Sequence, residues 1–282
     1  MTTKPKGLIA LLRLPYWLMT GGLSLLTAFA ITKTVFSVET ILQIFFSMAF
    51  ITSAGFSIND YFDRESDAVI KPKRPIPSGI FSLKQVVALS AFLFTVGLAL
   101  AFLINWLSFV ILLVDSILLV TYSSVIKKKS GFVANILVGL LVGTAFIYGE
   151  ATVSQQISFV SLSLYPICFG AIGGNILRDI LSLEGDSKTG YPTLPKTIGN
   201  KTSVRIAAFF FTLTATLAPL PFFLQFGYYY LTLIILWSIL LVYASIRLVT
   251  SNPTLPNVRK YERLITMSMM LLILSLIIEA IT

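Results

Sequence analysis

Two short acidic segments carry most of the carboxylates in this 282-residue sequence. They are Asp60, Asp63, Glu65 and Asp67 in the first segment, and Asp179, Glu184 and Asp186 in the second. Asp60, Asp63 and Asp67 stand at positions i, i+3 and i+7, a spacing that places them on one face of an α-helix. Carboxylates on one stripe repel one another unless a cation lies between them, and Mg²⁺ binds through one or two carboxylates plus substrate phosphates. The first segment therefore predicts a magnesium site for a phosphorylated substrate, with Arg and Lys side chains on the remaining phosphate oxygens.

The second segment repeats the first. Gly55, Asn59, Asp60, Asp63 and Asp67 align with Gly174, Arg178, Asp179, Ser182 and Asp186 at a constant offset of 119 residues. Internal repeats in membrane proteins often place the binding site where the repeats meet. Two such segments facing one cavity have the arrangement needed to hold a diphosphate between two Mg²⁺ ions. The alternative is that both are solvated loop charges, which the shared spacing and the concentration of acid in two places disfavour.

Composition indicates that membrane helices must position these segments. Hydrophobic residues make up 56% of the chain and charged residues only 12%, a balance that fits no soluble globular protein. The net charge is +9, but long apolar stretches separate the basic residues, so they form no basic groove. We therefore expect no nucleic-acid partner. The absence of histidine excludes a Ser-His-Asp triad, a Cys-His dyad and a histidine-ligated zinc or haem site.

Nine apolar runs are each long enough to cross a bilayer core of about 30 Å, which takes roughly 20 residues of helix. They are residues 14–36, 39–58, 83–104, 106–126, 132–150, 157–180, 203–225, 227–249 and 263–281. The first run is too long for a removed signal peptide. We therefore expect an all-α integral membrane protein with one domain at 1–282, made of pseudo-repeats at about 14–126 and 132–249 and a final helix at 263–281.

The distribution of Lys and Arg predicts the orientation, because basic residues accumulate on the cytoplasmic side of a membrane. With the amino terminus inside, 20 of the 21 basic residues lie at cytoplasmic helix ends or in cytoplasmic loops, and only Lys33 lies near an outer end. Both acidic segments then open cytoplasmic loops, and an odd number of spans places the carboxyl terminus outside. We expect a multi-pass protein of the cell membrane.

Residues 59–67, followed by Arg-Pro-Ile-Pro-Ser-Gly at 74–79, resemble the first signature of the UbiA superfamily of intramembrane prenyltransferases. Residues 179–186, with Gly190 and Thr-Leu-Pro at 193–195, are similar to the second signature. The resemblance covers essentially the whole chain. It implies a bundle of nine transmembrane helices around a central cavity. It also implies Mg²⁺-dependent transfer of a prenyl group from an isoprenyl diphosphate to a lipophilic or aromatic acceptor.

The resemblance also implies roles for individual residues. The expected metal ligands are Asp60, Asp63, Asp67, Asp179 and Asp186, and all of these except Asp60 are also the expected catalytic carboxylates. The side chains expected to contact the diphosphate are Arg13, Asn59, Lys71, Arg74, Tyr122, Lys127, Lys128 and Arg178. Ser182 departs from the family, which often has Asp there, so the second ion has one carboxylate fewer. The alternative for the lysines is a positive-inside anchoring role.

The expected chemistry suits a chain without histidine. An allylic diphosphate ionises when Mg²⁺ and Lys or Arg neutralise the charge that develops on the leaving group. The allylic cation then needs a dry pocket with aromatic walls, because ring faces stabilise cations and water would quench the intermediate. The 22 Phe and 11 Tyr residues make such walls easy to build.

Three further acids lie within or beside the predicted spans. Asp115 stands in the middle of the run at 106–126, where an ionisable group is costly and functional by default. It lies seven residues before Tyr122 and so on nearly the same face, which suits a group that positions or deprotonates the acceptor. The alternative is a buried acid hydrogen-bonded to a neighbouring helix. Glu150 and Glu279 lie near outer helix ends, where we expect their carboxylates to be solvated.

The acceptor is suggested by the run at 74–79 and by Glu-Gly-Asp at 184–186. These look most like family members that transfer a geranylgeranyl group to geranylgeranylglyceryl phosphate in archaeal ether-lipid synthesis. A glycerol hydroxyl would then be the nucleophile, and Lys71, Lys73 and Lys188 would provide a basic mouth for its phosphate. An aromatic or chlorin acceptor, as in quinone or chlorophyll synthesis, stays open.

Two other classes of protein use comparable features. A membrane transporter also fits the internal repeat and the number of spans. A CDP-alcohol phosphotransferase has intramembrane Asp clusters, but its signature begins with Asp-Gly and contains a fixed Ala-Arg, which this chain lacks.

Overall fold

Nine helical segments in the described part of the chain are long and apolar enough to cross a membrane. This computed structural model describes residues 4–187 and 190–282, apart from the side chains of Asp186 and Ser187. The segments are Lys4–Thr32, Val38–Phe62, Leu83–Ile104, Trp106–Lys129, Gly131–Ser154, Phe159–Gly185, Asn200–Phe223, Tyr228–Thr250 and Leu255–Ile281. The described residues contain helices and no strand, so the prediction of an all-α protein with nine spans is confirmed.

Most spans are single long helices. They are α3 (Val38–Phe62), α5 (Leu83–Ile104), α6 (Trp106–Thr121), α8 (Gly131–Ser154), α10 (Cys168–Ser187), α12 (Asn200–Leu217), α13 (Tyr228–Thr250) and α14 (Leu255–Ile281). Short elements at the ends are α4 (Arg64–Ile70), α7 (Lys127–Lys129), α9 (Phe159–Leu164) and α11 (Leu194–Ile198). Serine or asparagine side chains that accept a backbone N–H bond mark several helix starts, at Ser37, Ser82, Asn105, Ser130 and Ser158.

Two predicted helix starts were wrong. The first span begins at Lys4 rather than at residue 14, and it is divided into α1 (Lys4–Leu12) and α2 (Pro15–Thr32) by Arg13, whose φ is 51°. The last helix begins at Leu255 rather than at residue 263. The cause is the same at both places. Basic residues lower the local hydropathy although the helix continues beyond the apolar region.

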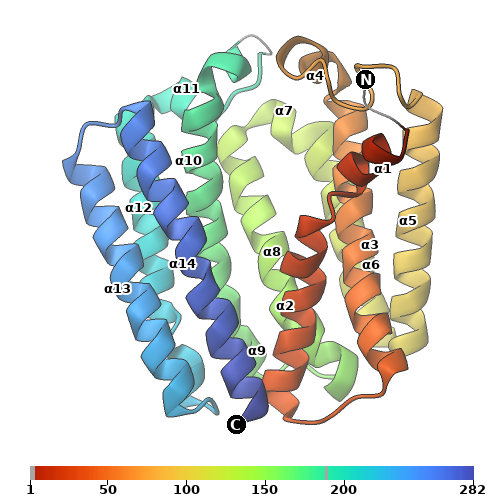
Figure 1. The fold of residues 1–282 in the computed structure, drawn as a ribbon, viewed down its shortest axis with the longest axis vertical. Coiled ribbons are helices and arrows are strands. Elements are labelled where there is room, and N and C mark those ends of the chain that lie inside the picture. Colours follow the sequence, from red (N-terminus) through yellow and green to blue (C-terminus); the bar gives the residue numbers. More distant parts are fainter. Residues whose placement is uncertain (1–3, 188–189) are drawn as a thin grey trace.

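The bundle places both acidic segments at one end (Figure 1). The amino terminus lies at that end together with α1, α4, α7 and α11, whereas α9 and the carboxyl terminus lie at the opposite end. Opposite ends for the two termini are what an odd number of spans requires. The first and last spans are neighbours, because α2 packs against α14. The single-domain assignment, the internal four-helix repeat and the central cavity stay predictions.

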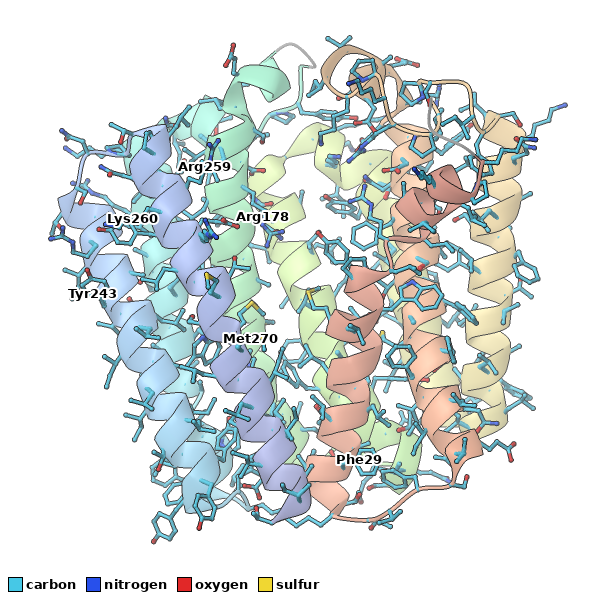
Figure 2. The ribbon with its side chains drawn as sticks, viewed as in Figure 1. Phe29, Arg178, Tyr243, Arg259, Lys260 and Met270 are labelled. Carbon is cyan, nitrogen blue, oxygen red and sulfur yellow. The ribbon has the colours of Figure 1, made fainter. Side chains whose placement is uncertain are left out.

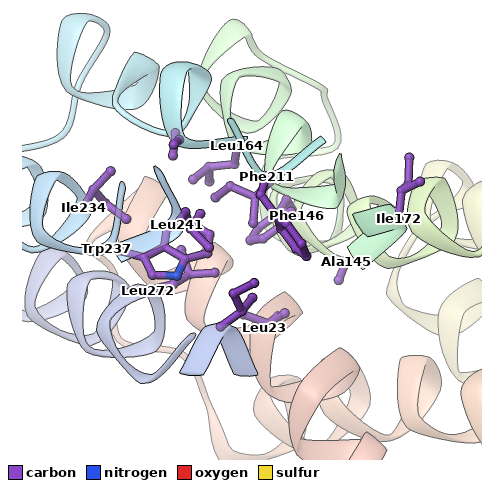
Figure 3. Packing of buried hydrophobic residues seen from close by; sticks show 14 of the residues in the cluster. Leu23, Ala145, Phe146, Leu164, Ile172, Phe211, Ile234, Trp237, Leu241 and Leu272 are labelled. Atoms are coloured by element: carbon purple, nitrogen blue, oxygen red, sulfur yellow. The ribbon is translucent and has the colours of Figure 1, made fainter. Parts of the chain in front are cut away.

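The apolar core joins helices from both halves of the chain. Leu23 of α2, Phe146 of α8, Phe211 of α12, Trp237 of α13 and Leu272 of α14 are buried in one cluster (Figure 3). Small residues allow close helix contact. A Cβ atom added to Gly149 of α8 would lie 2.3 Å from the carbonyl oxygen of Ser24 of α2, so these helices meet at backbone distance.

The two acids expected to be solvated at outer helix ends are buried instead. Glu150 accepts a 2.8 Å bond from the backbone N–H of Ser158 and a second bond from the hydroxyl of Ser161. Glu279 accepts a 2.8 Å bond from the backbone N–H of Gly227 and forms a 2.9 Å ion pair with Lys33. The prediction failed because the connecting loops fold over these helix ends and supply donors to the carboxylates.

Candidate active site

The first acidic segment crosses the junction of two helices. Helix α3 ends at Phe62 and α4 begins at Arg64, with Asp63 between them at φ −84° and ψ 0°. Asp60 therefore stands on α3 and Asp67 on α4, rather than on one uninterrupted stripe. All three carboxylates are nevertheless buried, with at most 5% of each residue exposed. Buried carboxylates require partners that offset the loss of water.

Arginines from two other segments provide partners for Asp60 and Asp67. Nη2 of Arg13 lies 2.9 Å and Nη1 of Arg74 3.1 Å from Oδ1 of Asp60. Arg74 also forms an ion pair with Asp67 and so bridges the junction between α3 and α4. Burial works against the charged form of Arg74, but the charges of Asp60 and Asp67 outweigh it and raise the pKa of the guanidinium. The guanidinium of Arg13 also lies 4.5 Å from the ring centroid of Phe56.

Asp63 has three partners from three parts of the chain. Nδ2 of Asn59 donates a 2.9 Å bond to Oδ2, and Lys127 forms an ion pair with the same oxygen. The hydroxyl of Tyr191, in the loop after α10, donates a 2.9 Å bond to Oδ1. Lys127 directly follows a π-helical turn at Tyr122–Ile126, a local widening that is frequent at functional sites.

Residues of both acidic segments lie near Tyr122. Asp179 of α10 accepts a 2.7 Å bond from Nδ2 of Asn135 of α8. Tyr122 lies within electrostatic range of Asp63, Asp179 and Arg13. The structure thus brings residues of both acidic segments and Tyr122 into one region.

Two further residues of the second segment lie on the surface. Ser182 is exposed, with its hydroxyl 3.4 Å from the carbonyl oxygen of Asp179, and Glu184 is also exposed. Asp186 belongs to the last turn of α10, but its side chain lies outside the described residues. Lys188 lies outside them entirely.

The structure gives other neighbours for three of the predicted diphosphate contacts, whose role stays a prediction. Arg178 pairs with Glu262 of α14 (Figure 2). Lys71 is exposed at the end of α4, and Nζ of Lys128 lies 5.7 Å from the ring centroid of Phe62. Lys128 lines a hollow of about 330 Å³. The other lining residues are Phe62, Arg64, Glu65, Ser66, Gly190 and Tyr191.

Asp115 is buried in the middle of α6, as its position in the predicted span suggested. Only 4% of the residue is exposed, and its carboxyl group lies close to Thr144 of α8, whose hydroxyl donates a 2.6 Å bond to the carbonyl oxygen of Leu141. Asp115 is thus a buried acid beside a neighbouring helix, and its role stays a prediction.

The donor atoms of the site suit a hard divalent cation. They are carboxylate and amide oxygens, and Oδ1 of Asn59 is buried without a hydrogen-bond partner. Within residues 4–187 and 190–282, no three His, Cys, Asp or Glu side chains converge as a ready-made metal cage. The buried carboxylates are paired with Arg, Lys or amide groups instead. A region with this mixture of cations and oxygen ligands can bind a polyphosphate together with metal ions.

Sequence reasoning missed two residues of this region, Asn135 and Tyr191. The sequence does indicate a role for Asn135, since a polar side chain in an apolar span is costly unless it has a partner. It gives no indication for Tyr191, because the contact of Tyr191 with Asp63 depends on how the loop after α10 folds.

Known proteins resemble this chain along most of its length. A model of the UbiA prenyltransferase family matches residues 19–272. A digeranylgeranylglyceryl phosphate synthase from Natronomonas pharaonis is 34% identical over 231 residues, which are 82% of this chain and 83% of the relative. A solved structure of a digeranylgeranylglyceryl phosphate synthase superimposes with a TM-score of 0.83 at 30% identity and covers 99% of both chains. A UbiA homolog from Archaeoglobus fulgidus bound to GPP and Mg²⁺ shares the fold, with a TM-score of 0.71 at 20% identity over 96% of this chain and 99% of that one.

Proposed function

The chain belongs to the UbiA prenyltransferase family, and from that premise we propose that it transfers a geranylgeranyl group to geranylgeranylglyceryl phosphate. It is a multi-pass membrane enzyme. We infer the acceptor from the relatives that are named for this reaction, because their product is a glyceryl phosphate with two geranylgeranyl chains. The carbon–oxygen bond to diphosphate breaks and leaves an allylic cation, the remaining glycerol hydroxyl forms a bond to its first carbon, and the hydroxyl proton passes to the released diphosphate or to water.

The observation that carries this proposal is the pairing of buried carboxylates with partly exposed cations. The side chains of Arg13, Arg74 and Lys127 are 22%, 23% and 25% exposed, so each can reach a bound anion while holding its carboxylate. Guanidinium and ammonium groups form short charge-assisted bonds with phosphate oxygens. We propose that these three side chains bind the diphosphate and stabilise the negative charge that develops as it leaves.

We propose that the site works with two Mg²⁺ ions. Asp60, Asp63 and Asp67, with the unpartnered Oδ1 of Asn59, provide oxygen ligands for one ion. Asp179 and Asp186 provide ligands for the other, which has one carboxylate fewer because Ser182 replaces the family Asp. When bound, the ions neutralise charge on the leaving diphosphate. The Archaeoglobus fulgidus homolog, which is bound to GPP and Mg²⁺, supports the use of Mg²⁺ with an isoprenyl diphosphate, and the number of two rests on the two acidic segments.

We further propose that the end of the bundle that carries the amino terminus faces the cytoplasm. That end holds the loops around α4, α7 and α11, in which most basic residues lie. A water-soluble metal ion and a released diphosphate would then enter and leave on the cytoplasmic side, and the carboxyl terminus would lie outside.

The test is a product assay with a panel of acceptors. Purified protein receives Mg²⁺, radiolabelled geranylgeranyl diphosphate and either geranylgeranylglyceryl phosphate, an aromatic acceptor or a chlorin. We expect free diphosphate and a labelled lipid only with the glyceryl phosphate, and no product from an Asp63→Ala protein. Product with another acceptor alone would contradict the assigned acceptor, and no product across the panel would contradict prenyl transfer.

A further inference from the structure

Arg178 is a charged residue within the membrane-spanning part of α10. In the described part of the chain it takes no part in the ion pairs of the buried carboxylates. Its side chain is 55% exposed. Among the described residues its guanidinium makes one interaction, in which Nε lies 3.8 Å from Oε1 of Glu262 of α14. A distance of 3.8 Å is too long for a hydrogen bond, so the donors of the guanidinium are left for another acceptor. Charged side chains in a membrane-spanning helix usually mark binding or functional positions.

The guanidinium of Arg178 lies next to a glycine one turn earlier in α10. A Cβ atom added to Gly174 would lie 3.5 Å from Nη2 of Arg178. The guanidinium therefore lies along the helix above a position without a side chain, and Figure 2 shows Arg178 between α14 and α8. Glu262 is in turn 3.4 Å from the hydroxyl of Thr266 on its own helix, so its carboxylate is shared.

Arg178 and Asp179 point to different neighbours although they are adjacent in the chain. Asp179 is bonded to Asn135 of α8 and lies within electrostatic range of Tyr122, beside the first acidic segment. Arg178 is paired with α14 instead. Successive residues of a helix differ by about 100° in direction, which accounts for this separation. The structure thus places a cation next to the diphosphate region but outside its network of buried ion pairs.

We propose that Arg178 binds the phosphate of the lipid acceptor. This inference rests on the proposed function. In a glyceryl phosphate lipid only a few covalent bonds separate the nucleophilic hydroxyl from the phosphate, so the phosphate must lie beside the diphosphate region when the hydroxyl reaches the donor carbon. A second phosphate there adds negative charge to a membrane-level site and requires its own cation. A guanidinium binds a phosphate through two parallel N–H bonds, which also orients the acceptor.

The test measures the KM of each substrate for Arg178→Gln. We expect the KM for geranylgeranylglyceryl phosphate to rise about tenfold or more, the loss of one charge-assisted contact, and the KM for geranylgeranyl diphosphate to stay within about twofold. With geranylgeranylglycerol, which lacks the phosphate, wild type and Arg178→Gln should have equal kcat/KM. Arg178→Lys should recover part of the loss, since it keeps the charge without the two-pronged geometry.

Two further variants separate phosphate binding from a structural role. Glu262→Gln removes the ion pair but leaves the cation, so it should keep or lower the acceptor KM, whereas a structural ion pair would make it behave like Arg178→Gln. Arg205→Gln, an exposed arginine of α12, is the matched control and should change neither KM.

The outcomes distinguish this inference from the function on which it rests. A rise in the donor KM instead would place Arg178 in the diphosphate site and overturn the inference. An unchanged acceptor KM in Arg178→Gln, with active wild type, would overturn it as well. Lower thermal stability with both KM values unchanged would assign Arg178 a structural role and also overturn it. A wild type that never prenylates the glyceryl phosphate would overturn the proposed function itself.

Discussion

The hydroxyl of Tyr191 donates a 2.9 Å hydrogen bond to Oδ1 of Asp63, across 128 residues of chain. Through this bond the loop after α10 is fastened to the junction of α3 and α4. The ring of Tyr191 also lies 5.1 Å from Nζ of Lys127, the cation paired with the other oxygen of Asp63. One loop residue thus contacts both members of the central ion pair, and its hydroxyl and its ring have separable roles.

Tyr191→Phe removes the hydroxyl and keeps the ring beside Lys127. We expect kcat/KM to fall roughly fivefold, because a net hydrogen bond is worth about 1 kcal/mol. Burial and the charge of Asp63 raise the pKa of the Tyr191 phenol, so it stays a protonated donor at and below the usual tyrosine pKa. The ratio of wild-type to variant rates should therefore be constant from about pH 6 to 9. Tyr243→Phe, an exposed tyrosine of α13, is the control, and equal rates for all three proteins would exclude a role for the hydroxyl.

Asp67→Asn should abolish most turnover without unfolding the protein. Asp67 is buried and paired with Arg74, and the change removes both a proposed metal ligand and the charge that holds this arginine. We expect kcat to fall about 100-fold or more, as for other groups that stabilise transition-state charge. Glu65→Gln is matched in sequence and chemistry, but 86% of the Glu65 side chain is exposed, so it should retain activity. Equal rates for the two variants would show that the buried carboxylate of Asp67 is not needed for catalysis.

The sequence predicts the spans better than it predicts the contacts between them. The nine apolar runs are visible because a membrane helix needs a fixed length of apolar residues, and the positions of Asp63 and Asp179 follow from a repeated spacing. The helix junction at Asp63 was not predictable, since the acidic spacing continues the helical period across it. The bond from Asn135 to Asp179 joins two helices, and periodicity within one helix does not determine which neighbour it meets.

Removal of divalent ions should stop the reaction. After treatment with EDTA we expect no turnover, and Mg²⁺ should restore it because the carboxylates of the site need a counter-cation when the diphosphate enters. Ca²⁺ at the same concentration should restore much less, since it is larger and takes 6–8 ligands where Mg²⁺ takes an octahedral set. Calorimetry with a non-reactive diphosphate analogue counts the ions, and the proposal requires two. Full turnover in EDTA would refute metal use, and a count of one would refute the second site.

Asp115→Asn tests whether the acid within α6 takes part in the reaction. Its buried carboxyl group lies close to Thr144 of the neighbouring helix α8, and asparagine has the same shape and keeps an acceptor oxygen. We therefore expect kcat and the acceptor KM to stay within about twofold of wild type. Asp115→Leu removes the acceptor and should lower thermal stability while leaving the rate per folded molecule unchanged. A tenfold loss of kcat in Asp115→Asn would instead assign the carboxylate to positioning or deprotonation of the acceptor.

Glu279→Ala should destabilise the bundle without affecting the chemistry. The buried carboxylate binds Lys33 and the N–H of Gly227, so it joins the end of α2, the start of α13 and the end of α14. Its loss leaves a lysine that is 40% exposed and a backbone donor without their partner, which we estimate at about 2 kcal/mol, or a fall of roughly 5 °C in the thermal midpoint. The kcat of folded protein should not change, because this cluster lies at the opposite end of the bundle from both acidic segments. Glu39→Ala alters an exposed acid at the start of α3 and serves as the control, and an equal midpoint for both variants would show that the buried pair contributes nothing to stability.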